Sequence, residues 1–256
     1  MGNKWPNELL MIRHGQSEAN VRKEAAKKAG QEPAWTGILR DMDSPLTPLG
    51  MQQAYVLGCE LRDRYPVTQT YKHHPVCKGG MLEYIITSPY VRTRQTTDWL
   101  IRGLGYEPRV VVDERLREID FGAMDGIDRK EFRRLYPHEA DRRERDGKYY
   151  YRPPGGENRP DCRMRGHSIL DTLNRDYVDT KTLISTHSVI VLALRSLLER
   201  WSEADYMQVD KEDDVQNCGL TVYKREDYRR LKLQEYNTII PTMMEGDEYR
   251  YGKTKS

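Results

Sequence analysis

Two histidines follow short apolar runs that have the length of β-strands. His14 comes after LLMI (9–12) and is preceded directly by Arg13, and His187 comes after TLIST (182–186). An uncharged imidazole is a good nucleophile, and a guanidinium recognises phosphate through paired hydrogen bonds. A single histidine after a strand is more often a packed or capping residue. The adjacent Arg13 is therefore the stronger indication of an anion-binding site, because its charge requires an anion or water as a partner.

Four further residues would complete such a site. Gly15 permits a turn that exposes backbone N–H groups to an anion, and Asn20 adds a neutral donor soon after it. Arg92 lies close to a predicted helix start, where negative charge is favoured. Glu118 is a candidate proton donor; nearby cations lower the pKa of a carboxyl and burial raises it. The sequence leaves open which of these two effects on Glu118 is larger.

Other kinds of active site fit the residues less well. A metal site made of His14, His187 and a carboxylate is disfavoured, because Arg13 would repel a divalent cation and no H-x-x-x-H spacing is present. The chain has no G-x-S-x-G nucleophile turn, no P-loop, and no G-x-G-x-x-G after a strand. The sequence therefore predicts no metal ion and no other cofactor.

The elements that must position these residues alternate between strand and helix. A third apolar run at 81–87 leads into Ser88 and Pro89, which predicts a helix with a capping hydroxyl and proline at its first position. Further strands are predicted at 109–113, 219–224 and 230–236, the last two as antiparallel edge partners. Such alternation predicts an α/β fold with a mainly parallel sheet and helices on both faces. Ligands bind at the carboxyl ends of strands in such sheets.

We expect one domain over residues 1–240, followed by a polar tail at 241–256. Two stretches, 21–45 and 123–165, read as insertions that form a lid over the site. The natural substrate would then be encoded in their shape. Tyr149, Tyr151 and Arg152 in the second insertion are more simply solvated loop residues than substrate contacts.

Composition excludes several classes of partner. Lys and Arg number 42 against 40 Asp and Glu, and the two signs are interleaved, which argues against a nucleic-acid footprint. No apolar run reaches the length of a membrane span. The four cysteines are scattered, which favours a reducing compartment, and residues 1–8 lack a leader pattern. We expect a cytoplasmic protein; the oligomeric state is not readable.

The candidate residues fall in motifs that resemble those of the histidine phosphatase superfamily, branch 1, the phosphoglycerate-mutase-like proteins. The motifs stand in the family's order: RHGQSEAN (13–20), LTPLGMQQA (46–54), SPYVRTRQT (88–96), LREIDFGAMDG (116–126) and GGEN (155–158). The resemblance implies a three-layer α/β/α sandwich and a phosphohistidine mechanism without metal. By position, His14 would be the nucleophile, and Glu118 the general acid and then base. The transferring phosphoryl group would be bound by Arg13, Asn20, Arg92 and His187.

Three positions depart from the family pattern. Ser188 stands where glycine usually follows the second histidine, and could cap the next helix. Asn158 stands where the GES-like turn carries serine, which leaves any donor role there open. Ala19 stands where the cofactor-dependent mutases carry tryptophan.

The resulting hypothesis is a metal-independent phosphomonoesterase of the histidine acid type, acting on a small phosphorylated metabolite. One alternative is a cofactor-dependent phosphoglycerate mutase. Another is a non-catalytic phosphate binder or scaffold, which the presence of both His14 and Glu118 disfavours.

Overall fold

The computed structural model describes residues 4–30, 40–66, 81–212, 214–227 and 230–241. Within these residues, six strands form one sheet in the order β3-β2-β4-β1-β5-β6. The strands are β1 (Glu8–Arg13), β2 (Tyr84–Thr87), β3 (Arg109–Val112), β4 (Lys181–Thr186), β5 (Leu220–Asp227) and β6 (Arg230–Thr238). The pairs β1–β4, β2–β4 and β2–β3 are parallel, whereas β5 runs antiparallel to both β1 and β6. The predicted mainly parallel sheet is confirmed.

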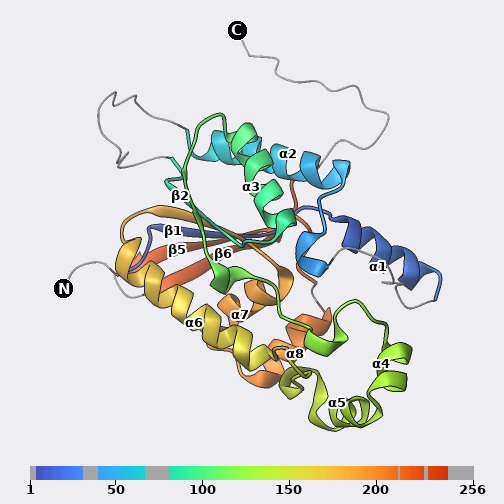
Figure 1. Ribbon diagram of the computed structural model, residues 1–256. Coiled ribbons are helices and arrows are strands. Elements are labelled where there is room, and N and C mark those ends of the chain that lie inside the picture. The colour runs from blue at the N-terminus through green and yellow to red at the C-terminus, as the bar shows by residue number, and fades with distance from the viewer. Residues whose placement is uncertain (1–3, 31–39, 67–80, 213, 228–229, 242–256) are drawn as a thin grey trace.

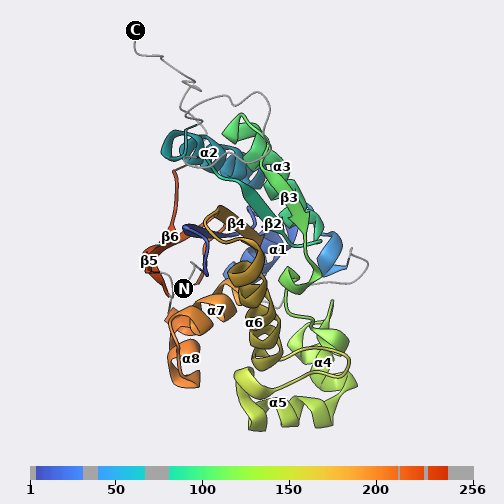
Figure 2. The same ribbon diagram turned by 90° about the vertical axis from the view of Figure 1, so that its left-hand side faces the viewer.

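Helices cover both faces of this sheet (Figure 1). Side chains of a strand point alternately to the two faces, and β1 accordingly sends Leu10 and Ile12 into one cluster and Leu9 and Met11 into the other. The first cluster packs against α2 (Pro48–Arg64) and α3 (Val91–Leu104). The second packs against α6 (Arg159–Asp176) and α7 (Ser188–Leu198). The turned view in Figure 2 shows the sheet between these two helix pairs, which makes the architecture an α/β/α sandwich.

The remaining elements belong mostly to the connections. They are α1 (Glu18–Lys28), η1 (Asp41–Asp43), η2 (Glu114–Leu116), η3 (Gly122–Met124), α4 (Arg129–Leu135), α5 (Pro137–Tyr150) and α8 (Glu203–Glu212). Helices α1, α4 and α5 lie beyond the end of the sheet at which β1 leads into α1 (Figure 1). No helix within the described ranges is long and apolar enough to cross a membrane.

The two predicted insertions differ in how much of them can be compared with the structure. Residues 31–39 of the first and nearly all of the predicted tail (242–256) lie outside the described residues. The second insertion, 123–165, contains α4, α5 and the first turns of α6. Its Tyr149 and Tyr151 are buried in hydrophobic clusters rather than solvated, because they pack the inserted helices against their neighbours.

Two predicted helix starts are wrong in detail. The helix after β2 begins at Val91 rather than at Ser88-Pro89, and its N-cap residue Tyr90 makes no side-chain capping bond. Similarly, Ser188 is the first residue of α7 and not its cap, since His187 occupies the N-cap position without a side-chain bond. In the first case Ser88 lies three residues before the helix, and its hydroxyl accepts the N–H of Tyr90 at 3.3 Å and also bonds to the ring of His187.

Candidate active site

The two histidines lie side by side at the carboxyl end of the sheet. Strands β1 and β4 are neighbours, and their register pairs Arg13 with Thr186. The next residue of each strand is a histidine, and the backbone N–H of His14 donates to the carbonyl of Thr186 at 2.9 Å. The ring centroids of His14 and His187 are 5.3 Å apart. The parallel pairing therefore brings together two side chains that are 173 positions apart in the sequence.

The hydrogen bonds of His14 define its tautomer. Its Nδ1 lies 2.7 Å from the carbonyl oxygen of Gly15, an acceptor, so this nitrogen carries the proton. Nε2 then holds a lone pair and accepts a hydrogen bond from Arg92 Nε at 3.1 Å. Burial, followed by the charges of Arg92 and Arg13, lowers the pKa of His14 well below its usual 6.5. The imidazole is thus uncharged and presents Nε2 to a cationic neighbour.

A close backbone approach shapes the turn after His14. A Cβ on Gly15 would lie 2.4 Å from the carbonyl oxygen of Gly50, and one on Gly50 would lie 2.1 Å from that of Gln16. No real Cβ tolerates such distances. The glycines of the R-H-G and L-T-x-x-G motifs are therefore required because the turn packs directly on the start of α2.

His187 is bonded at one ring nitrogen only. Its Nε2 lies 2.8 Å from the hydroxyl of Ser88 at the end of β2. Its Nδ1 is buried and has no hydrogen-bond partner among the described residues. Burial, and then the charge of Arg92, lowers the pKa of His187 well below 6.5. A buried ring nitrogen without a partner is unusual.

Arg13 and Asn20 are each held by the segment before β5. Arg13 donates through Nη1 to the carbonyl of Val215 at 2.5 Å, while its buried Nε has no partner among the described residues. Burial lowers the pKa of Arg13. The Asn20 oxygen accepts from the N–H of Ser17 and from Nδ2 of Asn217, which also donates to the carbonyl of His14. The protein thus engages the oxygen of Asn20, and the donor role of its NH2 group stays a prediction.

Glu118 lies in the connection that follows η2. Its Oε1 accepts the N–H of Ile119 at 3.0 Å. Burial raises the pKa of the carboxyl above 4.5, even though that N–H and the charge of Arg92 oppose the rise. The question left open by the sequence is settled: the effect of burial is the larger one. A carboxyl with a raised pKa is suited to donating a proton.

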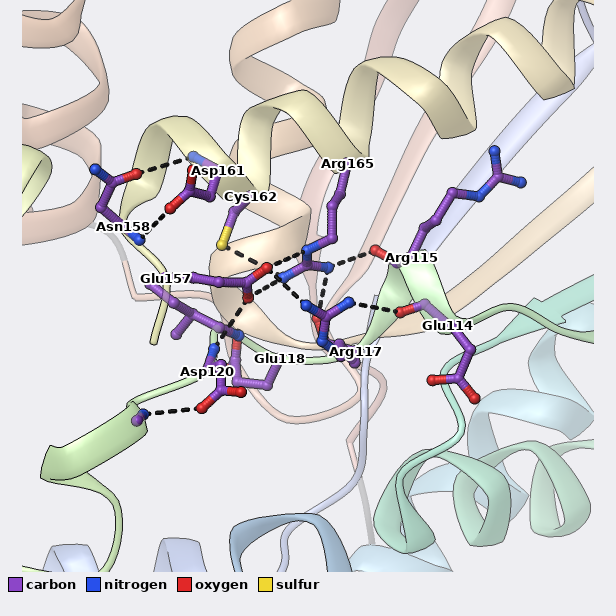
Figure 3. Close-up of polar contacts among 12 residues, drawn as sticks. Glu114, Arg115, Arg117, Glu118, Asp120, Glu157, Asn158, Asp161, Cys162 and Arg165 are labelled. Atoms are coloured by element: carbon purple, nitrogen blue, oxygen red, sulfur yellow. Dashed lines mark hydrogen bonds and ion pairs between the residues drawn. The ribbon is translucent and has the colours of Figure 1, made fainter. Parts of the chain in front are cut away.

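An ion-pair network clamps the connection on both sides of Glu118 (Figure 3). Arg165 on α6 binds both carboxylate oxygens of Glu157, at 2.9 and 2.8 Å, and donates to the carbonyl of Arg117 at 3.0 Å. Glu157 also accepts from Nη2 of Arg117 at 2.8 Å and from the N–H of Asp120 at 3.1 Å. The connection on both sides of Glu118 is therefore fixed by one partly buried pair, Glu157 and Arg165.

Asn158, the departure in the GES-like turn, has a local structural role. It is the N-cap of α6, its side chain accepts the N–H of Asp161, and the Asp161 carboxylate accepts the N–H of Asn158 in return. Asparagine and serine are equally good N-caps, which explains why asparagine is compatible with this turn.

The structure brings most of the predicted site residues into one place. His14, Arg92 and His187 are in direct or neighbouring contact, and the charges of Arg13 and Arg92 both act on Glu118. Sequence reasoning missed Asp41, Ser88 as a partner of His187, Asn217, and the Glu157–Arg165 pair. Of these, Ser88 and Glu157 had a signal, because they lie in the SPYVRTRQT and GGEN motifs.

Fold and site together define a class: an α/β sandwich with an uncharged histidine and arginines gathered at the carboxyl end of its sheet. The family model for the histidine phosphatase superfamily (branch 1) matches residues 9–238. The chain belongs to this superfamily.

Known proteins similar to the chain carry several names. A phosphoglycerate mutase-like protein of Arabidopsis thaliana is 26% identical over 85% of this chain and 73% of its own length. A 2,3-bisphosphoglycerate-dependent phosphoglycerate mutase of Sinorhizobium fredii is 25% identical over 79% of this chain and 84% of its own. Among solved structures, a mycobacterial glucosyl-3-phosphoglycerate phosphatase has a TM-score of 0.62, at 23% identity over 90% of this chain and 99% of its own.

Proposed function

We propose that the protein is a phosphomonoesterase that acts through a phosphohistidine on a small phosphorylated molecule. The observation that carries this proposal is the pair of bonds on the His14 ring, Nδ1 to Gly15 and Nε2 to Arg92. Together they keep the ring uncharged and fix its lone pair beside a cation. That is the arrangement needed to attack a phosphoryl group whose oxygens must be neutralised.

In the first step, Nε2 of His14 attacks phosphorus and the bond to the ester oxygen breaks. The leaving oxygen takes the proton of Glu118. Arg13, Arg92 and His187 hold the non-bridging oxygens. In the second step, Glu118 takes a proton from water, which attacks the phosphohistidine and releases inorganic phosphate and the neutral His14. Each step balances in protons and charge, and Glu118 returns to its starting form.

Several named relatives support a phosphatase. The similar structures include the mycobacterial glucosyl-3-phosphoglycerate phosphatase and a protein of Escherichia coli described as a putative alpha-ribazole-5'-P phosphatase. A sedoheptulose 1,7-bisphosphatase of Saccharomyces cerevisiae is 33% identical over 46% of this chain and 37% of its own length. The phosphoglycerate mutases among the relatives support the second candidate. Ala19, which is buried where those mutases are expected to carry tryptophan, favours hydrolysis.

The deciding experiment traps the intermediate. Brief incubation with a radiolabelled phosphomonoester followed by denaturation should leave label on the protein that is lost in acid and retained in alkali. His14→Ala should carry no such label and release no phosphate, while its circular dichroism matches that of the wild type. Normal turnover by His14→Ala, or complete loss of wild-type activity in chelator, would refute the proposal. Isomerisation of 3-phosphoglycerate faster than hydrolysis, with bisphosphoglycerate present, would replace it by the mutase.

A further inference from the structure

Arg92, the arginine on the His14 ring, is also bound by an acidic residue. Its Nη2 donates to the Asp41 carboxylate at 2.8 Å and its Nη1 donates to the Asp41 backbone carbonyl. The two side chains are 4% and 17% exposed. Since Nε bonds His14, every nitrogen of this guanidinium is already engaged by a protein acceptor.

Asp41 and a bound phosphoryl group would therefore compete for the nitrogens of Arg92. A phosphoryl group that approaches His14 Nε2 replaces the ring as the partner of Arg92 Nε. To obtain a second, forked hydrogen bond it must displace Asp41 from Nη1 or Nη2. In addition, the Asp41 carboxylate lies near the incoming anion and repels it through a medium in which charges are poorly screened.

Asp41 also lines a small recess next to the Arg92 guanidinium. Together with Tyr90 and Phe121 it lines this recess, which also holds Arg40, Asp120 and Asp125. The pKa of Tyr90 is raised to about 12, by burial and then by the charge of Asp41. An organic group that reaches this recess would thus meet aromatic rings and three carboxylates against one guanidinium.

We infer that Asp41 is a specificity-determining residue of this site. By holding the outer nitrogens of Arg92, it weakens the binding of free phosphate and discriminates against esters that carry a second anionic group close to the phosphate. The preferred substrates are then phosphomonoesters whose organic part is uncharged or cationic. The preference among esters rests on the proposed function. The competition between Asp41 and inorganic phosphate for Arg92 does not require that the protein hydrolyse an ester.

The competing hypothesis gives Asp41 the opposite effect: it orients Arg92 and thereby improves phosphate binding. Asp41→Asn separates the two roles. Asparagine keeps an oxygen that accepts from Nη2 and leaves the backbone carbonyl in place, so the guanidinium keeps its position. Only the negative charge is removed.

Isothermal titration calorimetry with inorganic phosphate measures the competition directly. We expect Asp41→Asn to bind phosphate about fivefold more tightly than the wild type, the order of effect of one partly exposed charge pair. Asp125→Asn is the matched control, since it removes the same charge from the same recess without contacting Arg92; it should change the affinity by less than about twofold. Equal or weaker binding by Asp41→Asn would overturn the inference, as would equal tightening by both variants.

Substrate discrimination gives the second measurement. The ratio of kcat/KM for nitrophenyl phosphate to that for 3-phosphoglycerate should fall about tenfold in Asp41→Asn, because the carboxylate of the latter no longer meets Asp41. An unchanged ratio would contradict the inference. Asp41→Ser, which is shorter and uncharged, serves both measurements if Asp41→Asn does not fold. If the wild type hydrolyses neither ester, the proposed function fails, and the calorimetry still decides the role of Asp41.

Discussion

The inner and outer halves of the pocket are built by different means. The inner half, with His14 and His187, is positioned by the ends of paired strands, and both side chains are at most 3% exposed. The outer half, with Glu118 and Asp41, comes from irregular connections and is held by side-chain ion pairs. The register of paired strands depends on the packing of the whole core, whereas an ion pair positions only the residues near it. The positions of His14 and His187 should therefore be set by the folding of the core, whereas the residues of the outer half should be adjustable without unfolding the protein.

The sharpest test of this contrast is Glu118→Gln. The amide cannot donate a proton as an acid, so hydrolysis of alkyl phosphates should slow by about 10²–10⁴-fold. A nitrophenyl ester, whose leaving group departs unaided, should be much less affected. Measured kcat values for the two esters decide; equal losses would show that Glu118 is not the acid. The melting temperature should not fall, in keeping with a residue of the outer half.

The two buried histidines of the inner half should make the stability of the protein depend on pH. Both histidines have a folded pKa below 6.5, so below that pH the unfolded chain takes up protons that the native protein does not. Stability is then full above pH 6.5 and is lost as the pH falls. At pH 5 the loss relative to pH 8 should be on the order of 2 kcal/mol per histidine.

Urea unfolding of His187→Gln measures this effect. The variant should lose less stability between pH 8 and pH 5 than the wild type does. His167→Gln is the control, because the His167 side chain is 68% exposed. If His187→Gln lost as much stability between pH 8 and pH 5 as the wild type, the ring of His187 would not be buried in its neutral form.

The clamp around Glu118 should give a smaller effect. Glu157→Gln removes the charge that holds Arg165 and Arg117, which loosens the connection on either side of the acid. We expect kcat for alkyl phosphates to fall about tenfold with little change in KM, and nitrophenyl phosphate to be nearly unaffected. Glu139→Gln is a matched control: Glu139 pairs with Arg142 in the same insertion. A loss shared by both esters would indicate general damage and not misplacement of Glu118.

The smallest expected effect is at the cap of α6. Asn158→Ala should lower the free energy of unfolding by about 1 kcal/mol, because the backbone N–H of Asp161 loses its side-chain acceptor. Asn158→Ser should restore most of it. Thermal unfolding of the three proteins makes the comparison, and a deficit in the serine variant as large as that in alanine would show that asparagine does more than cap.

Much of the inner half was predictable, because strand runs and the residues after them are local features. Apolar runs before His14 and His187 predicted strand ends, and the rule for ligand sites in parallel sheets placed both at one edge. The start of α3 was mispredicted for a reason that lies far away in the chain. Ser88 is of a residue type that caps helices, but its hydroxyl is shared between the N–H of Tyr90 and the ring of His187, which approaches only once β2 and β4 pair.

The amino-acid sequence by itself determined the alternation of strands and helices, the family, and the residue types that gather at the sheet edge, since periodicity and short motifs are properties of neighbouring residues. Only the tertiary structure decided the tautomer of His14, the direction of the Glu118 pKa shift and the engagement of Arg92 by Asp41. Each of these depends on burial and on charges contributed by distant segments. Electrostatic interactions depend on separation in space, which the spacing of residues along a chain does not specify.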